Sequence, residues 1–192
     1  MFCGSEALAG GQLTRQQLRG PNWRRLLRDA YADARLPVTH GLYIAAARLV
    51  IPLQAVIAGR SAGWLYGAEE LATATDPVEV LVPQAHRFGS VAGLRIRTTQ
   101  VLPRSDVDDR EGLRCTTPVR TAPDIARTAP DLVEAVTALD LLVARKVVSA
   151  ARLEQAASQL PRVNGCARAR RAVQLADGRS ESPRSRGCAS VW

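Results

Sequence analysis

The stretch that decides the fold runs from residue 112 to residue 148, GLRCTTPVRTAPDIARTAPDLVEAVTALDLLVARKVV. Leu113–Thr116 predicts a short strand, and Thr117 followed by Pro118 predicts the start of a helix, because threonine is a common N-cap and proline is favoured at the first helical position. A second helix is expected to begin at Asp131. Its apolar residues recur every three or four positions and predict one continuous buried face: Leu132, Val133, Val136, Leu139, Leu142 and Val143. We expect the flanking strands and helices to pack on this helix.

The residues around this stretch predict an α+β fold with several helices on a small mixed sheet. Val78–Val82 is a continuous apolar run and Gly93–Thr99 alternates apolar with charged residues, and both patterns are typical of strands. Asp106–Glu111 is acidic but lacks the ligand spacing of a calcium-binding loop, so we expect a polar loop there. Further helices are predicted at Thr39–Ile51, at Ser61–Tyr66 with Ser61 as the cap, at Ser149–Leu160 and at Gly165–Asp177.

The positive charge of the protein lies at the two ends of the chain. The 192 residues carry 26 basic and 18 acidic side chains. Residues 1–31 contain five arginines and two acidic residues, and residues 162–192 contain seven arginines and two acidic residues. Residues 32–161 contain fourteen basic and fourteen acidic residues. This distribution is typical either of a neutral core whose ends meet a polyanion, or of solvated ends that only keep the protein soluble.

Residue types that perform catalysis or bind metal ions are not grouped in this sequence. The four cysteines have no CxxC spacing and the two histidines lie far apart, which argues against a zinc site and a disulfide framework. We therefore predict no catalytic site, metal or cofactor, and no enzyme. Met1–Gly11 lacks the regions of a signal peptide, and Arg48 and Pro52 interrupt the most apolar run, so we expect a cytoplasmic protein without a membrane span.

The first 35 residues predict a short basic module. Thr14 and Gln17 have the spacing of a capping box, which indicates a short helix that Gly20 and Pro21 end. The apolar residues of Trp23–Tyr31 fit a helical period and an alternating period about equally well. Periodicity alone therefore leaves the second half of this module open between helix and strand.

Six segments, in this order and at this spacing, resemble a family of actinobacterial proteins with an AbiEi-type antitoxin N-terminal region: LTRQQLRGPNWRRLLRDAY (13–31), AAARLVIP (45–52), GRSAGWLYG (59–67), PVEVLVP (77–83), TTPVRTAPDIAR (116–127) and EAVTALDLLV (134–143). The resemblance implies a small winged helix-turn-helix in which Arg24–Tyr31 forms the strands of the wing. Asp29 stands where the family usually has glycine in the wing turn. The implied division is a winged-helix-like basic module at 1–35, an AbiEi-like mixed α/β domain at 36–177, and a disordered tail at 178–192.

DNA is the partner that this resemblance implies for the basic module. Because Gly20 and Pro21 leave little room for a full-length recognition helix, we expect contacts to DNA phosphates rather than base-specific reading. A basic module that only packs against the next domain stays open as the alternative. The residues expected to contact DNA are Arg15, Gln16, Arg19, Arg24, Arg25 and Arg28.

The predicted function is therefore a DNA-binding, antitoxin-like transcriptional regulator, with two alternatives. Many members of the family continue into a nuclease-like domain that resembles very-short-patch-repair endonucleases. Here Arg184 stands in place of the expected glutamate after Pro183, and the carboxylates that would hold a catalytic metal have no positions. The chain could thus be a truncated, inactive remnant of such a protein. It could also be an interaction module that holds a cognate toxin protein.

Overall fold

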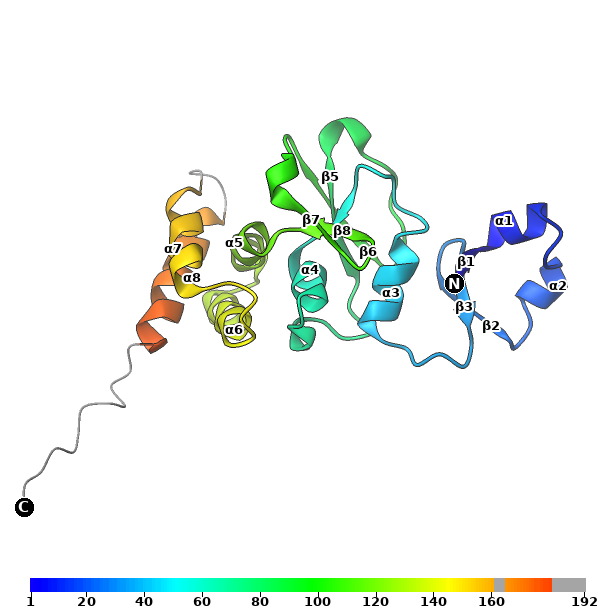
Figure 1. Ribbon diagram of the computed structural model, residues 1–192, viewed down its shortest axis with the longest axis horizontal. Helices are drawn as coiled ribbons and strands as arrows, with labels where there is room; N and C mark the ends of the chain where they lie inside the picture. The colour runs from blue at the N-terminus through cyan, green and yellow to red at the C-terminus, as the bar shows by residue number, and fades with distance from the viewer. Residues whose placement is uncertain (161–164, 181–192) are drawn as a thin grey trace, which may run out of the picture. The chain divides into compact units, whose positions relative to one another are not determined.

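The computed structural model of the protein describes residues 1–160 and 165–180, and the chain divides into two compact units, Met1–Thr121 and Ala122–Trp192 (Figure 1). Helix α5, Pro118–Thr128, runs across the boundary between the two units. Helices accompany two small sheets, one of three strands and one of five. The predicted α+β class is therefore confirmed.

The first unit begins with a small module of short elements. Its strands form an antiparallel sheet in the order β1-β3-β2. The Thr14 hydroxyl accepts the N–H of Gln17 at 3.2 Å, and the Gln17 side chain accepts the N–H of Thr14 at 2.8 Å. The predicted capping box is therefore confirmed. The elements are β1 Phe2–Cys3, α1 Gly4–Ala9, α2 Arg15–Leu18, β2 Trp23–Leu27 and β3 Ala30–Asp33.

A β-bulge explains why the period of residues 23–31 was ambiguous. Strand β2 pairs regularly with β3 up to Arg25, and the register shifts before Leu27 pairs with Ala30. A bulge places one extra residue in a strand and so interrupts the alternation of faces. As a result, the consecutive residues Leu26 and Leu27 are both buried. The strand interpretation is correct, and the helix-like spacing of the leucines comes from the bulge.

The wing turn between β2 and β3 is closed by an aspartate in the left-handed conformation. Asp29 has φ 66°, a region that aspartate adopts more readily than most residues with a side chain. Its carboxylate accepts the Ser5 N–H at 2.8 Å, and its carbonyl oxygen accepts the Gly4 N–H at 2.9 Å. The turn therefore forms without glycine, and it is bonded to the start of α1.

The second part of the first unit is a mixed five-stranded sheet with the order β6-β5-β4-β8-β7. The pairs β5/β6 and β4/β8 are parallel, and β4/β5 and β7/β8 are antiparallel. The strands predicted at 78–82 and 93–99 are confirmed. The elements are α3 His40–Ala47, β4 Val56–Ile57, α4 Gly59–Leu65, β5 Val78–Pro83, β6 Leu94–Thr99, β7 Val107–Arg110 and β8 Leu113–Thr116, with short 3₁₀ turns at Glu69–Leu71, Gln84–His86 and Arg104–Asp106.

The acidic segment before β8 is a strand, so the prediction of a polar loop there is wrong. β7 and β8 form a hairpin whose two turn residues, Glu111 and Gly112, have φ 55° and 75°. This is the left-handed geometry that two-residue hairpin turns require. Because β7 is the outer strand of the sheet, it does not need an apolar face, and exposed charges protect such an edge from pairing with other chains.

The core of the first unit joins its two sheets through helix α3, which lies between them (Figure 1). Thr39 caps α3 as its sequence suggests, but the helix ends at Ala47, four residues before the predicted end. One buried cluster includes Leu27 and Ala30 of the small sheet, Ile44 of α3, and Ile57 and Val80 of the large sheet. The basic module therefore shares a core with the five-stranded sheet.

The second unit is helical. Its elements after α5 are α6 Leu132–Ala144, α7 Ala150–Ser158 and α8 Cys166–Ser180. Helix α6 begins as predicted, with the Asp131 carboxylate accepting the Glu134 N–H at 2.8 Å. The helices α6 and α7 both pack on α8. None of the helices in the described part of the chain is long and apolar enough to span a membrane.

Two predictions about α6 are wrong. We expected it to organise the strands, but the five-stranded sheet has its own core in the first unit, around α3. We also expected Val133 on its buried face, and this side chain is 75% exposed. Two alanines complete the buried face in place of Val133: Ala135 and Ala138 are buried, as is Leu139 beside them. At the other end of the unit, α8 continues to Ser180, and the rest of the predicted tail lies outside the described residues.

Candidate nucleic-acid interface

Three of the six residues expected to contact DNA lie on or beside helix α2. Arg15 and Gln16 begin this helix and Arg19 caps its C-terminus, and all three are exposed. Arg15 and Arg19 are four residues apart and so project from the same side of the helical turn. With four residues, α2 is far shorter than a helix that reads a major groove. The expectation of phosphate contacts rather than base reading is consistent with this length.

The other three residues lie on the wing, and the structure does not place all of them on one face. Arg24 and Arg25 are neighbours on β2, opposite Ala32 and Tyr31 of β3, and neighbouring strand residues point to opposite faces of a sheet. Arg24 donates a hydrogen bond to the Leu36 carbonyl oxygen at 3.0 Å. Arg25 is exposed and makes only a long bond, 3.4 Å, to the Leu27 carbonyl oxygen.

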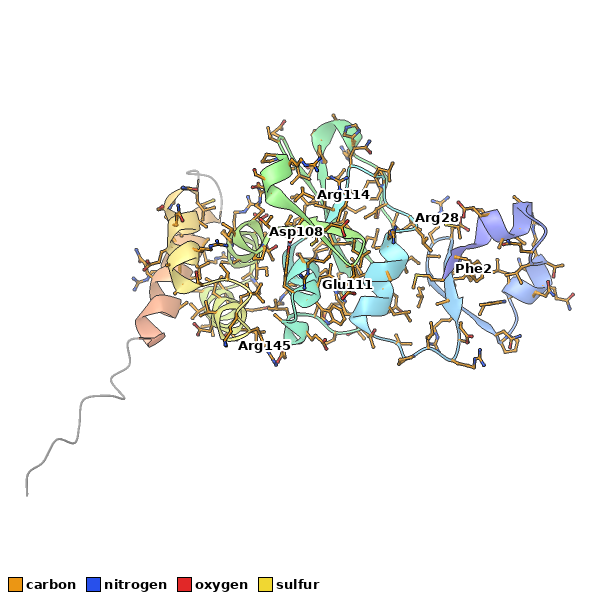
Figure 2. All side chains as sticks on the ribbon, in the orientation of Figure 1. Phe2, Arg28, Asp108, Glu111, Arg114 and Arg145 are labelled. Carbon is orange, nitrogen blue, oxygen red and sulfur yellow. The ribbon has the colours of Figure 1, made fainter. Side chains whose placement is uncertain are left out.

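The five arginines of residues 15–28 have no acidic partner in the part of the chain that the structure describes. Arg28 lies in the turn between β2 and β3 and is exposed (Figure 2). In the described residues, no carboxylate forms an ion pair with any of these five arginines. An aromatic cluster packs on the sheet of this module, in which the Phe2 ring lies 4.9 Å from Trp23 and 6.0 Å from Tyr31, centre to centre. The side chains of Arg15, Arg19 and Arg28 therefore keep all their donors available, whereas Arg24 and Arg25 each donate to a backbone carbonyl oxygen.

A family model for the AbiEi antitoxin C-terminal domain matches residues 54–177. The chain belongs to this antitoxin family. The resemblance noted from the six segments is confirmed at this level, with one refinement: the matched part is the C-terminal domain of the antitoxin, and it begins after the basic module. No curated protein and no solved structure matches the chain. AbiEi antitoxins are not a family of enzymes.

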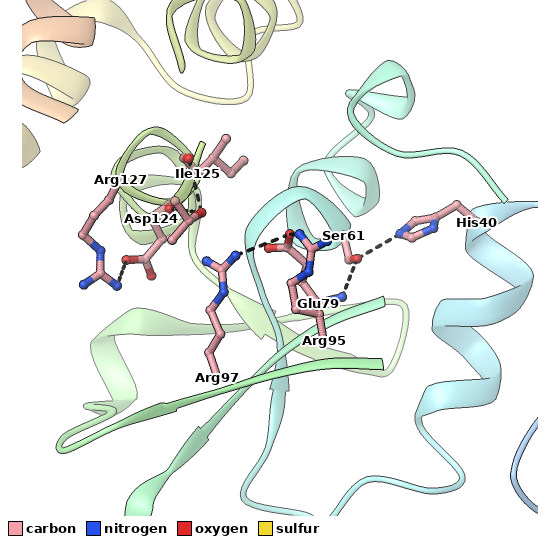
Figure 3. Close-up of polar contacts among 9 residues, drawn as sticks. His40, Ser61, Glu79, Arg95, Arg97, Asp124, Ile125 and Arg127 are labelled. Atoms are coloured by element: carbon pink, nitrogen blue, oxygen red, sulfur yellow. Dashed lines mark hydrogen bonds and ion pairs between the residues drawn. The ribbon is translucent and has the colours of Figure 1, made fainter. Parts of the chain in front are cut away.

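His40 of helix α3 and residues of the matched AbiEi domain form a buried polar centre that sequence reasoning did not find (Figure 3). Ser61 was predicted as a helix cap, but α4 already begins at Gly59 and Ser61 lies inside the helix, fully buried. The Ser61 hydroxyl lies 2.9 Å from His40 Nε2 and accepts the Glu79 N–H at 2.9 Å. His40 Nδ1 lies 3.0 Å from the Thr73 carbonyl oxygen.

These contacts define the protonation of His40. A carbonyl oxygen can only accept, so Nδ1 carries the proton and Nε2 accepts the Ser61 hydroxyl hydrogen. His40 is only 2% exposed, and its burial lowers the pKa of the imidazole below 6.5, against the smaller opposite effect of the bond to Thr73. The neutral ring thus joins α3 and α4 to the loop before β5. This arrangement is structural, because Ser61 is inaccessible to any substrate.

The side chain of Glu79 makes a second set of polar contacts, with strand β6. Its carboxylate is 7% exposed and receives Arg95 at 3.1 Å, with Arg97 at 3.8 Å from the same oxygen atom (Figure 3). Glu79 pairs with Arg95, and Leu81 with Arg97, across the parallel strands β5 and β6. Arg95 and Arg97 therefore lie on the same face of β6, as the alternation of apolar and charged residues in this strand predicts. Gly59 makes room for Glu79, since a Cβ atom at position 59 would lie 1.7 Å from its Oε2.

The described residues do not assemble a metal site or a catalytic constellation. No group of three or more His, Cys, Asp or Glu side chains in residues 1–160 and 165–180 is arranged to hold a metal ion. Cys115 is buried, and burial raises the pKa of its thiol, so it does not have the properties of a reactive thiolate.

Proposed function

We propose that the protein is a DNA-binding antitoxin that regulates transcription and contacts DNA phosphates through its basic module. The observation that supports this proposal most directly is that Arg15, Arg19 and Arg28 are exposed and that their side chains form no hydrogen bond or ion pair within the described residues. Arginines left without partners on a rigid module are typical of surfaces that receive phosphates. The match to the AbiEi antitoxin C-terminal domain supports the antitoxin part of the proposal.

The test is a fluorescence-anisotropy titration of the full chain with the DNA upstream of its own gene and with a scrambled duplex, at two salt concentrations. We expect tighter binding to the upstream DNA. Each phosphate contact releases counterions, so the slope of log K against log salt reports their number, about 0.9 per contact. The triple variant R15Q/R19Q/R28Q is expected to lower this slope by about 3.

Arg35→Gln is the matched control, because it removes one positive charge from the same module. Arg35 is already paired with Asp33 at 2.6 Å, and its hydrogen bonds lower the pKa of that carboxyl to about 2. We expect it to leave DNA affinity nearly unchanged. Equal and steeply salt-dependent binding of both duplexes would restrict the proposal to non-specific contact, and an unchanged slope in the triple variant would contradict it.

A second candidate is a toxin-holding module, and the position of the family match favours it. The matched residues, 54–177, exclude the basic module, so an antitoxin activity of this domain does not require the arginines at 15–28. If the protein holds a toxin through this domain, the triple variant R15Q/R19Q/R28Q will still protect cells that express a toxin encoded beside it. Loss of protection together with loss of DNA binding would favour regulation alone.

A further inference from the structure

One of the two edge strands of the five-stranded sheet carries two arginines that contact a buried carboxylate. This strand is β6, at the opposite edge from β7, and Arg95 and Arg97 project from the same face of it, about 7 Å apart along the strand. Their side chains are 53% and 31% exposed, whereas that of Glu79, on the neighbouring strand β5, is 7% exposed. The carboxylate is therefore buried, and both arginine side chains that reach it remain partly accessible to solvent.

Glu79 uses little of the hydrogen-bonding capacity of these arginines. It accepts one hydrogen bond, from Arg95, and reaches Arg97 only at 3.8 Å, which is an ion pair without a hydrogen bond. A guanidinium group has five N–H donors, so most donors of the pair are unused in the described residues. Two arginines and one carboxylate also leave a net charge of +1. The cluster is therefore not a closed ion-pair network.

The geometry points to a phosphate-binding site formed by Arg95 and Arg97, in which Glu79 is the positioning residue. Arginine side chains bind phosphate oxygens through paired, charge-assisted N–H bonds, and fixing their direction in advance lowers the entropic cost of binding. Gly59 is part of this arrangement, because any side chain there would displace the Glu79 carboxylate. The site goes beyond the proposed function, since it lies on β6 of the AbiEi domain and does not use the basic module.

The phosphate could belong to a nucleic-acid backbone or to a free nucleotide, and one experiment distinguishes these sources. We would record the side-chain Nε–Hε signals of the arginines by NMR while titrating the full chain with inorganic pyrophosphate, with ATP and with a short DNA duplex. The signals of Arg95 and Arg97 are expected to shift with pyrophosphate. Arg97→Gln is expected to weaken pyrophosphate binding roughly tenfold, which corresponds to the loss of one charge-assisted interaction.

Arg35→Gln serves again as the control, because Arg35 is 90% exposed but pairs with Asp33 instead of flanking a buried carboxylate. It should not change the pyrophosphate affinity. Shifts of Arg95 and Arg97 with the duplex as well would identify a nucleic-acid backbone as the source, and shifts with pyrophosphate and ATP alone would identify a free nucleotide. If millimolar pyrophosphate moves neither signal, or moves Arg35 equally, the site does not exist.

The outcome for this site is separable from that for the basic module. The duplex titration is repeated on R15Q/R19Q/R28Q, in which β6 is intact. If the duplex fails to bind the unmodified chain while pyrophosphate shifts Arg95 and Arg97, the proposed DNA-binding function fails and the phosphate site stands. If the duplex binds through residues 15–28 and pyrophosphate has no effect, the proposed DNA-binding function stands and the phosphate site fails.

Discussion

The arginines of the basic module and those of helix α8 have the same chemistry but different uses. The side chains of Arg15, Arg19 and Arg28 form no hydrogen bond or ion pair within the described residues. In α8, by contrast, Arg168 donates to the carbonyl oxygen of Ala129, just after the end of α5, and Arg170 donates to that of Leu160, just after α7. Carbonyl groups at the C-terminal end of a helix have no hydrogen-bond donor within the helix, and basic side chains commonly donate to them.

This difference teaches that a count of charges does not identify a binding surface. The sequence shows an excess of arginine at both ends of the chain, and it does not distinguish ends that meet a polyanion from ends that are only solvated. In α8 two of these arginines are structural. The same contrast exists for serine, because Ser61 is buried with two partners, whereas Ser5 bonds the Asp29 carboxylate at the exposed surface. Substitutions of matched residues can test it.

The largest effect is expected for Ser61→Ala. Removing the hydroxyl leaves His40 Nε2 and the Glu79 N–H buried without partners, and each unpaired buried group costs about 1–3 kcal/mol. We expect the free energy of unfolding to fall by about 2–4 kcal/mol, measured by urea denaturation with tryptophan fluorescence. Ser5→Ala is the control and should cost less than about 1 kcal/mol. If both variants lost the same free energy of unfolding, the buried hydrogen bonds of Ser61 would contribute no more than an exposed one.

A smaller loss is expected for Arg168→Gln in α8. The Ala129 carbonyl oxygen loses its donor, and a hydrogen bond from a charged group contributes about 1.5–3 kcal/mol. Thermal unfolding followed by circular dichroism should show a lower midpoint than for the unmodified protein. Arg171→Gln removes the same charge from the same helix, where Arg171 is exposed and 3.4 Å from Gln174, and should leave the midpoint nearly unchanged. A lower midpoint in both variants would assign the effect to charge alone.

Features that depend on neighbouring residues could be predicted from the sequence, and features that depend on distant contacts could not. The caps at Thr14 and Asp131 are formed within three residues of the helix start, so their spacing is sufficient to predict them. The strand at β5 is similarly evident as an apolar run. The role of Ser61 depends on His40 and Glu79, about 20 residues away on either side, and no local pattern marks it.

The errors on α6 and β7 have one physical origin. Both predictions assumed that burial follows hydrophobicity along a single segment. The apolar face of α6 indicated burial correctly, but it could not indicate which element covers that face. β7 is held in the sheet by backbone pairing with β8 and by the Tyr66 hydroxyl, which donates to Asp108 at 3.0 Å, so Val107 is the one apolar residue that it contributes. A prediction based on polarity alone therefore assigns such an edge strand to a loop.

The dependence of stability on pH extends the comparison to the two histidines. The pKa of His40 is lowered in the folded protein, so the unfolded chain binds a proton more readily as the pH falls below 6.5. The folded state is then progressively destabilised as the pH falls below 6.5. Urea denaturation at a series of pH values below 7 should give a flatter profile for His40→Gln than for the unmodified protein. His86 is exposed, so His86→Gln is the control for the substitution itself and should change the free energy of unfolding at neutral pH by less than about 0.5 kcal/mol.

The smallest effect on stability is expected for an arginine of the basic module, whose substitution should instead weaken DNA binding. Arg19 is exposed and has no partner in the described residues, so Arg19→Gln should change the free energy of unfolding by less than about 0.5 kcal/mol. If the basic module contacts DNA, the same variant lowers the salt slope of binding by about 0.9, as one lost phosphate contact requires. Arg168→Gln should do the reverse and destabilise the protein without changing the slope. A variant of Arg19 that lost stability, or one of Arg168 that lost DNA affinity, would remove the distinction between arginines that hold the fold and arginines that face a ligand.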